Sequence, residues 1–448
     1  MKMLPRTMRK RLQATPLLAR LVGNTSWLFG DRVVALLLNT FTGIWLARYL
    51  GPEQFGFYSF ALAFVALIAA IATIGVDGIV TRDLVNRPAS AGELLGTSFG
   101  MRLAAGLAAI ALAVGAVIWS RPADPLAHAM VAIVALTLIF RPLDVIDVWF
   151  QARLQARYAV VVRAVTLTLM TALRVGLILM GAPLVAFAWA MLAEVALTAC
   201  GLAAAYLLRG QSFGAWRFSP ARAGALLREG WPLIVGGVSV TIYMRFAPVL
   251  LGQLLDNEAV GLYAVAQRLS ETTYFIPTAI MSSLTPALIA ARQGDRAHYL
   301  RRVQRVYNLM VLVALAITVP ASLLAAPAIA LLFGAHYAPA GPILSLHVFG
   351  LVFVGLGVAQ STWDINEGFM RANMLRTVGG ALVNVALNLL LIPRLGGVGA
   401  AIATVAAHAS AAWLLNLLHP SLWPNFRRQT RALLLVDPVL ALGRRARI

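Results

Sequence analysis

Apolar residues recur along the chain in runs long enough to cross a lipid bilayer. At about 1.5 Å of rise per helical residue, roughly 20 such residues cross a hydrocarbon core about 30 Å thick. Runs of this kind, bounded by proline, glycine or charge, predict an all-α polytopic membrane protein with about 12 transmembrane helices. The predicted spans are 25–47, 56–80, 100–119, 126–150, 164–182, 184–208, 231–251, 259–290, 306–333, 342–363, 373–392 and 398–418.

Composition agrees with this pattern and excludes several classes of protein. Only 12% of the 448 residues are charged, against about 25% in an ordinary soluble domain. The net charge of +20 comes from short basic clusters between spans, without a nucleic-acid-binding motif, so we expect no nucleic-acid partner. The only cysteine is Cys200, and the histidines lack metal-ligand spacing, so we expect no disulfide, metal or other cofactor.

The distribution of positive charge predicts the topology. Lysine and arginine next to membrane segments are retained in the cytoplasm. With a cytoplasmic N-terminus, the inner segments hold 29 of these residues and the outer loops hold three. We therefore expect a multi-pass protein of the cell inner membrane with both termini cytoplasmic. The expected parts are a cytoplasmic N-terminal segment, an N-lobe, a cytoplasmic linker, a C-lobe and a basic cytoplasmic tail, at 1–24, 25–208, 209–230, 231–420 and 421–448.

A short motif recurs where the first helix of each half gives way to the second. Residues 50–58 read LGPEQFGFY and residues 255–263 read LDNEAVGLY, with Leu, Glu, Gly and Tyr in register at an offset of 205. Gly51 and Pro52 cannot continue a helix, and Gly56 permits close packing at the start of the next one. The offset and the helix count together predict two six-helix lobes related by a pseudo-two-fold repeat, as in many transporters.

Three segments carry a resemblance to a known family. NTSWLFGDR at 24–32, ARYLGPEQFGFYS at 47–59 and GVDGIVTRDL at 75–84 together resemble the polysaccharide-biosynthesis flippases of the multidrug/oligosaccharidyl-lipid/polysaccharide exporter superfamily. The resemblance implies a two-lobed carrier, not an enzyme, of O-antigen or exopolysaccharide type. It would move undecaprenyl-pyrophosphate-linked oligosaccharide from the cytoplasmic to the periplasmic leaflet. Its implied partners are that substrate, anionic membrane lipids, and the polymerase and chain-length proteins of the pathway.

Two arginines within spans stand out as anion-binding candidates. Arg174 and Arg245 have no acid three or four residues away and belong to different halves of the chain. An unpaired guanidinium at bilayer depth needs an anion, water or an interhelical partner. We expect the two arginines to form a cross-lobe cradle for the pyrophosphate or an acidic sugar.

Other embedded arginines have an acid at helical spacing. Arg141 lies three residues before Asp144, and Arg268 lies three residues before Glu271. The spacing favours structural ion pairs, because buried charges are normally neutralised by a partner, and substrate contact is the alternative.

Two arginines near the ends of spans have two alternative roles each. Arg32, next to Asp31 at the cytoplasmic boundary, is either a gate charge or an interfacial anchor. Arg48, at the predicted outer mouth, either attracts the emerging glycan or extends to the lipid headgroups.

Further polar residues are candidates for coupling and glycan contact. Glu194 lies near the middle of the sixth span with no base at helical spacing, which suits proton coupling or an interhelical hydrogen bond. Asp31 and Glu271 are the other ion-coupling candidates. Asn384 and Asn388 share one face of the eleventh span, where they contact either the glycan or a neighbouring helix.

Three other functions compete with the flippase interpretation. A multidrug exporter of the same superfamily would favour an acidic lumen, and a scaffold would need no unpaired charge at bilayer depth. A membrane-embedded polymerase, ligase or glycosyltransferase would need a sizeable loop carrying catalytic residues, whereas the predicted outer loops are short. The sequence lacks a GxxxxGK[ST] phosphate loop, so we expect coupling to an ion gradient or the membrane potential.

Overall fold

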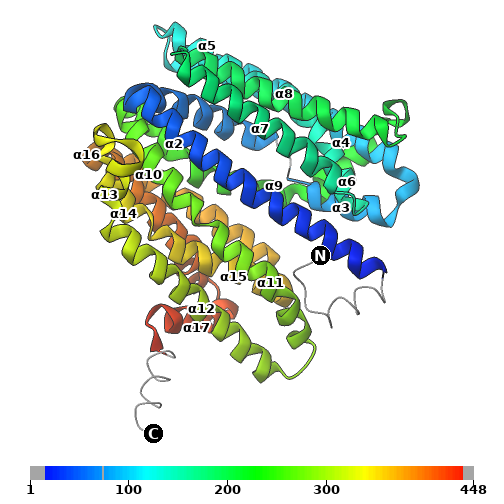
Figure 1. Cartoon of the computed structure of the whole chain (residues 1–448). Helices are drawn as coiled ribbons and strands as arrows, with labels where there is room; N and C mark the ends of the chain where they lie inside the picture. The colour runs from blue at the N-terminus through cyan, green and yellow to red at the C-terminus, as the bar shows by residue number, and fades with distance from the viewer. Residues whose placement is uncertain (1–15, 73–74, 437–448) are drawn as a thin grey trace. The chain divides into compact units, whose positions relative to one another are not determined.

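The computed structural model describes residues 16–72 and 75–436, and every regular element within them is helical (Figure 1). The α-helices are α2 (Pro16–Ala72), α3 (Asp77–Asn86), α4 (Ala91–Ser120), α5 (Pro125–Leu136), α6 (Val145–Ala152), α7 (Arg157–Leu179), α8 (Leu184–Leu208), α9 (Pro220–Leu254), α10 (Asn257–Thr272), α11 (Phe275–Arg292), α12 (Arg296–Leu323), α13 (Ala325–Phe333), α14 (Ala340–His347), α15 (Gly350–Glu367), α16 (Met370–Ala412) and α17 (Trp423–Leu433). Short 3-10 turns join several of them.

The membrane-spanning pattern predicted from the sequence is confirmed. The described residues contain 10 apolar helical stretches long enough to cross a bilayer. Two of them, Ser26–Ala70 and Met370–Leu418, are 45 and 49 residues long, more than twice the roughly 20 residues that one crossing requires. Each is interrupted by a glycine with positive φ, Gly51 at 71° and Gly396 at 56°. Dividing both stretches at these glycines gives the 12 predicted crossings.

Proline positions explain other interruptions in the spans. The eighth predicted span is broken between Thr272 and Phe275, immediately before Pro277. The ninth is broken at Leu324, three residues before Pro327. Proline lacks the N–H that an α-helix requires and clashes with the preceding turn, so both interruptions have a local cause.

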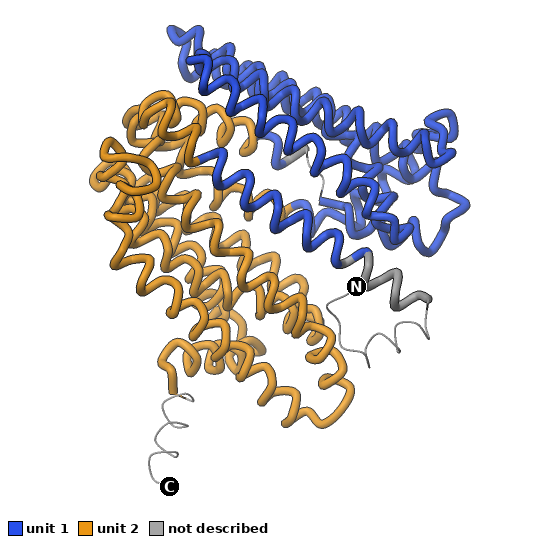
Figure 2. The backbone as a smooth tube through the Cα atoms, in the orientation of Figure 1, with its two compact units in different colours: residues 1–43, 68–234 blue, residues 44–67, 235–448 orange. Residues whose placement is uncertain are grey.

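The chain divides into two compact units, which are coloured separately in Figure 2. Unit 1 comprises residues 1–43 and 68–234, and unit 2 comprises residues 44–67 and 235–448. The division differs from a simple cut at the linker, because 44–67 groups with the second half. The last boundary, between residues 234 and 235, lies inside α9, which begins at Pro220 within the stretch predicted as linker.

The linker before α9 is packed against unit 1 rather than extended. The backbone N–H of Arg217 donates to the carbonyl of Gly92 at 3.2 Å, and that of Ser219 donates to the Thr97 hydroxyl at 3.1 Å. A Cβ at Gly92 would lie 2.3 Å from the carbonyl oxygen of Ala215, so this approach requires glycine. The start of α9 is also tied to α3. Hydrogen bonds from the Arg82 guanidinium to Glu229 and Asp83 raise the pKa of Arg82.

The repeated motif forms a close contact within unit 2. A Cβ at Gly56 would lie 1.7 Å from the carbonyl oxygen of Asn257, and one at Gly261 would lie 2.0 Å from that of Pro52. Because neither repeat glycine has a side chain, the backbone of the other repeat's turn can approach it closely. This confirms the prediction that Gly56 permits close packing, and it gives Gly261 the same role.

Candidate functional site

Arg174 and Glu194 are partners across two helices of unit 1. The Arg174 guanidinium on α7 donates to the Glu194 carboxylate on α8, and Arg174 is buried at 9% exposure. Neither residue has a partner at helical spacing, but each has one on the neighbouring helix, which is the interhelical alternative that the sequence left open. They are 20 positions apart, beyond any helical spacing rule, and lie on two consecutive helices that the turn at 180–183 joins.

Arg245 and Glu271 repeat this arrangement in unit 2. Arg245 Nη2 on α9 lies 3.9 Å from Glu271 Oε2 on α10, on either side of the turn at 255–256. The amide of Gln267 donates to Glu271 Oε1 at 2.6 Å and to the carbonyl of Met244 at 2.7 Å. Arg245, like Arg174, therefore has an acid on the next helix, although no acid lies at helical spacing. The ion pair between Glu271 and Arg268 stays a prediction.

A charge cluster in unit 1 joins three helices. Arg163 on α7 donates from Nε to Asp31 on α2 at 2.9 Å and from Nη1 to Asp147 on α6 at 2.6 Å. Gln151 donates to the same oxygen of Asp147 at 3.2 Å, while Asp147 Oδ1 is buried without a protein partner. The cluster holds two carboxylates and one guanidinium. Reasoning from sequence selected Asp31 but missed Asp147 and Arg163, because their pairing depends on helix packing.

The remaining candidates lie in varied surroundings. Arg141 and Asp144 form the predicted pair at 3.8 Å, with both side chains partly exposed. Arg32 and Arg48 are exposed. Asn384 and Asn388 are fully buried on α16, where Asn388 Nδ2 donates to Asn384 Oδ1 at 2.9 Å. Asn384 Nδ2 and Asn388 Oδ1 have no protein partner in the structure, so this pair retains one donor and one acceptor.

A second buried ionic network in unit 2 has no counterpart among the sequence candidates. Arg376 on α16 donates to Asp364 on α15 and to the side-chain oxygen of Asn416, and Asp364 and Asn416 are completely buried. Gln360 and Gln429 extend the network through amide hydrogen bonds of 2.7–2.9 Å. Gln429 belongs to α17, within the stretch predicted as a basic tail, so part of that stretch is ordered by the core of unit 2.

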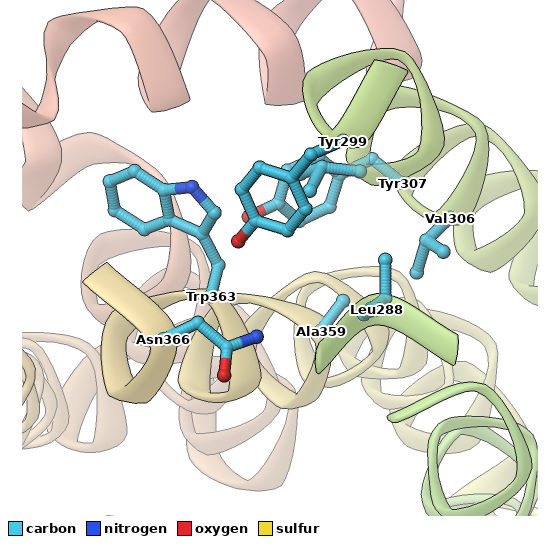
Figure 3. A pocket seen from close by; sticks show the side chains of 8 residues that line it. Leu288, Tyr299, Val306, Tyr307, Ala359, Trp363 and Asn366 are labelled. Carbon is cyan, nitrogen blue, oxygen red and sulfur yellow. The ribbon is translucent and has the colours of Figure 1, made fainter. Parts of the chain in front are cut away.

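A small cavity lies beside this network, among α11, α12 and α15 (Figure 3). It is lined by the apolar residues Leu288 and Ala359 and by the ring systems of Tyr299, Tyr307 and Trp363. Its volume admits about one water molecule. The cavity is therefore too small for a lipid headgroup or a sugar, and the charge pairs described above are the stronger candidates for substrate chemistry.

The apolar spans and the fold define a multi-pass α-helical membrane protein. The chain matches the family model described as polysaccharide biosynthesis protein over residues 45–342, well over half of its length. It belongs to the polysaccharide biosynthesis protein family.

A curated relative and several solved structures share parts of the sequence or the fold. The chain is 30% identical over 204 residues to the probable flippase AglR of Haloferax volcanii; the match covers 42% of this chain and 40% of the relative. An inward-facing multidrug resistance MATE transporter of the MOP superfamily has a TM-score of 0.71 at 19% identity, covering 88% of this chain and 94% of that one. The lipid II flippase MurJ has a TM-score of 0.70 at 14% identity, covering 94% and 93%. At these identities the structural matches establish the fold alone.

Proposed function

We propose that this protein is a flippase for cell-surface polysaccharide biosynthesis. It would move undecaprenyl-pyrophosphate-linked oligosaccharide from the cytoplasmic to the periplasmic leaflet by alternating access. The observation that carries the proposal is the family match over residues 45–342. The name of the curated relative, a probable flippase, points in the same direction. The protein would lie in the inner membrane with both termini in the cytoplasm, as the charge distribution predicts.

The substrate headgroup is anionic and must pass through a low-dielectric region. The carrier therefore needs positive charges that the headgroup can contact when it binds. In Arg174–Glu194 and Arg245–Glu271 a carboxylate occupies each guanidinium. We propose that pyrophosphate oxygens replace the carboxylate when substrate binds, because guanidinium binds phosphate with the same bidentate geometry. The ion pair thus keeps each arginine neutralised between transport cycles.

Coupling is assigned to the Asp31–Arg163–Asp147 cluster. The cluster contains two carboxylates and one guanidinium, and one oxygen of Asp147 is buried without a partner. Uptake of one proton or one monovalent cation would neutralise the cluster. In this assignment Glu194 and Glu271 are the counter-ions of the arginines rather than separate coupling sites.

The test is complementation of a strain that lacks its own flippase. Periplasmic glycan polymer should return when the chain is expressed, and the Asp147→Asn variant should insert normally but restore little polymer. Export of cationic drugs without polymer would identify a multidrug exporter instead. Absence of both activities from fully inserted protein would refute transport of either kind.

A further inference from the structure

An amphipathic helix usually buries its apolar face, whereas helix α17 buries a mainly polar face. Its completely buried residues are Asn425, Gln429 and Ala432, which share one face at spacings of four and three. Asn425 Oδ1 accepts from the Tyr307 hydroxyl at 2.8 Å, and Gln429 Nε2 donates to Gln360 at 2.9 Å. Polar side chains therefore hold α17 against the core of unit 2.

Additional contacts fix the orientation of α17. The amide of Gln304 on α12 donates to the carbonyl of Arg428 at 3.0 Å. The ring of Phe426 stacks on Trp413, with the centroids 5.5 Å apart and the planes 8° from parallel. Figure 1 shows α17 lying against α12. The residues on the opposite face of α17 are thus presented outward in a defined arrangement.

The outward face of α17 combines basic and large apolar side chains. Arg427 and Arg431 are exposed, and so are Trp423 and Leu434, at 47% and 69%. The last apolar span ends at Leu418, which is itself 78% exposed. Residues 414–436 contain no acidic residue. Tryptophan, leucine and arginine side by side at the end of a span are typical of the membrane interface.

Basic residues of α12 extend this surface. Arg301 and Arg305 are exposed on the same helix that supplies Gln304 and Tyr307 to the contact with α17. Arg301 lies 3.9 Å from Asp295, a contact between two exposed side chains that screening by water weakens. Exposed arginines therefore occur both on α17 and on the helix against which it packs.

We propose that the outer face of α17, with the exposed arginines of α12, is a docking surface for the anionic phospholipid headgroups of the leaflet in which the last span ends. Trp423 and Leu434 would enter the headgroup region while Arg427 and Arg431 bind phosphate oxygens. Charge complementarity selects this occupant, since the surface is basic and the apolar residues beside it favour the interface. The buried network of Gln429, Asn416 and Arg376 serves to fix the orientation of this surface.

The test uses the purified full-length chain and no transport substrate. Native mass spectrometry would measure retention of phosphatidylglycerol and of phosphatidylcholine by the wild type and by Arg427→Gln/Arg431→Gln. Each arginine near an anionic surface contributes about fivefold to affinity, so the double variant should bind phosphatidylglycerol roughly 30-fold more weakly. Binding of phosphatidylcholine should not change.

The matched control is Arg87→Gln/Arg228→Gln, which removes two exposed arginines from unit 1. It should retain phosphatidylglycerol like the wild type. Arg427→Lys/Arg431→Lys keeps the charge and should also bind, which separates loss of charge from loss of folding. Equal retention by the glutamine variant, or an equal loss in the control, would overturn the assignment.

Discussion

Substitutions in the Arg174–Glu194 pair can distinguish its role in stability from its role in transport. Removing one partner of a buried ion pair costs about 3–5 kcal/mol, because the other charge stays desolvated without compensation. The side chain of Arg174 is 11% exposed and that of Glu194 is 24% exposed. Glu194→Ala, which strands the more deeply buried charge, should therefore destabilise the protein more than Arg174→Ala. A loss of about 3 kcal/mol corresponds to roughly a 160-fold change in the ratio of folded to unfolded protein.

The decisive variant replaces both charges together. Arg174→Met/Glu194→Leu leaves no stranded charge, and such replacements are commonly neutral or stabilising. We expect this variant to insert and to melt at or above the wild-type temperature, measured by detergent-solubilised thermal unfolding. If Arg174 binds the substrate headgroup, the same variant should restore no periplasmic polymer in the flippase-deficient strain. Normal polymer from the well-inserted double variant would show that the pair is purely structural and would refute the proposed exchange of carboxylate for phosphate.

Two further predictions concern the repeat contact and the topology. Gly56→Ala should destabilise the protein by about 3 kcal/mol or more, because the obstructing atom belongs to the backbone and cannot rotate away. The control Gly237→Ala, on an open face of α9, should be neutral or stabilising by up to about 1 kcal/mol; equal melting temperatures for the two variants would contradict the close contact. In a Cys200→Ser background, a cysteine at Gln54 should react with an impermeant thiol reagent added to spheroplasts, whereas one at Gln211 should not. The reverse labelling would invert the proposed topology.

The fold was predictable because its signals are local. Span length follows from bilayer thickness, and the interruption at Gly51 and Pro52 follows from backbone chemistry within two residues. The repeat motif also predicted close packing at Gly56, although only the structure shows that the repeats contact each other.

The charge pairs were not predictable by the same means. A search for acids three or four residues away finds Arg141–Asp144 and misses Arg174–Glu194, because the second pair joins neighbouring helices. Arg245–Glu271 is missed for the same reason, because its two residues lie on consecutive helices and are 26 positions apart. Asp364 and Arg376 are 12 positions apart and also lie on consecutive helices, so they escape the same search. The docking of α17 joins Gln429 to Gln360, which are 69 positions apart, and no local rule brings them together.

The most direct test of the central claim is lipid movement in reconstituted vesicles. The purified protein would be placed in proteoliposomes containing a fluorescent undecaprenyl-pyrophosphate-linked oligosaccharide, and the fraction open to an impermeant quencher would be followed over time. We predict protein-dependent exchange of the lipid between leaflets that responds to an imposed ion gradient and is absent with Arg174→Met/Glu194→Leu. Exchange no faster than in protein-free vesicles, from protein that is folded and fully inserted, would contradict the account.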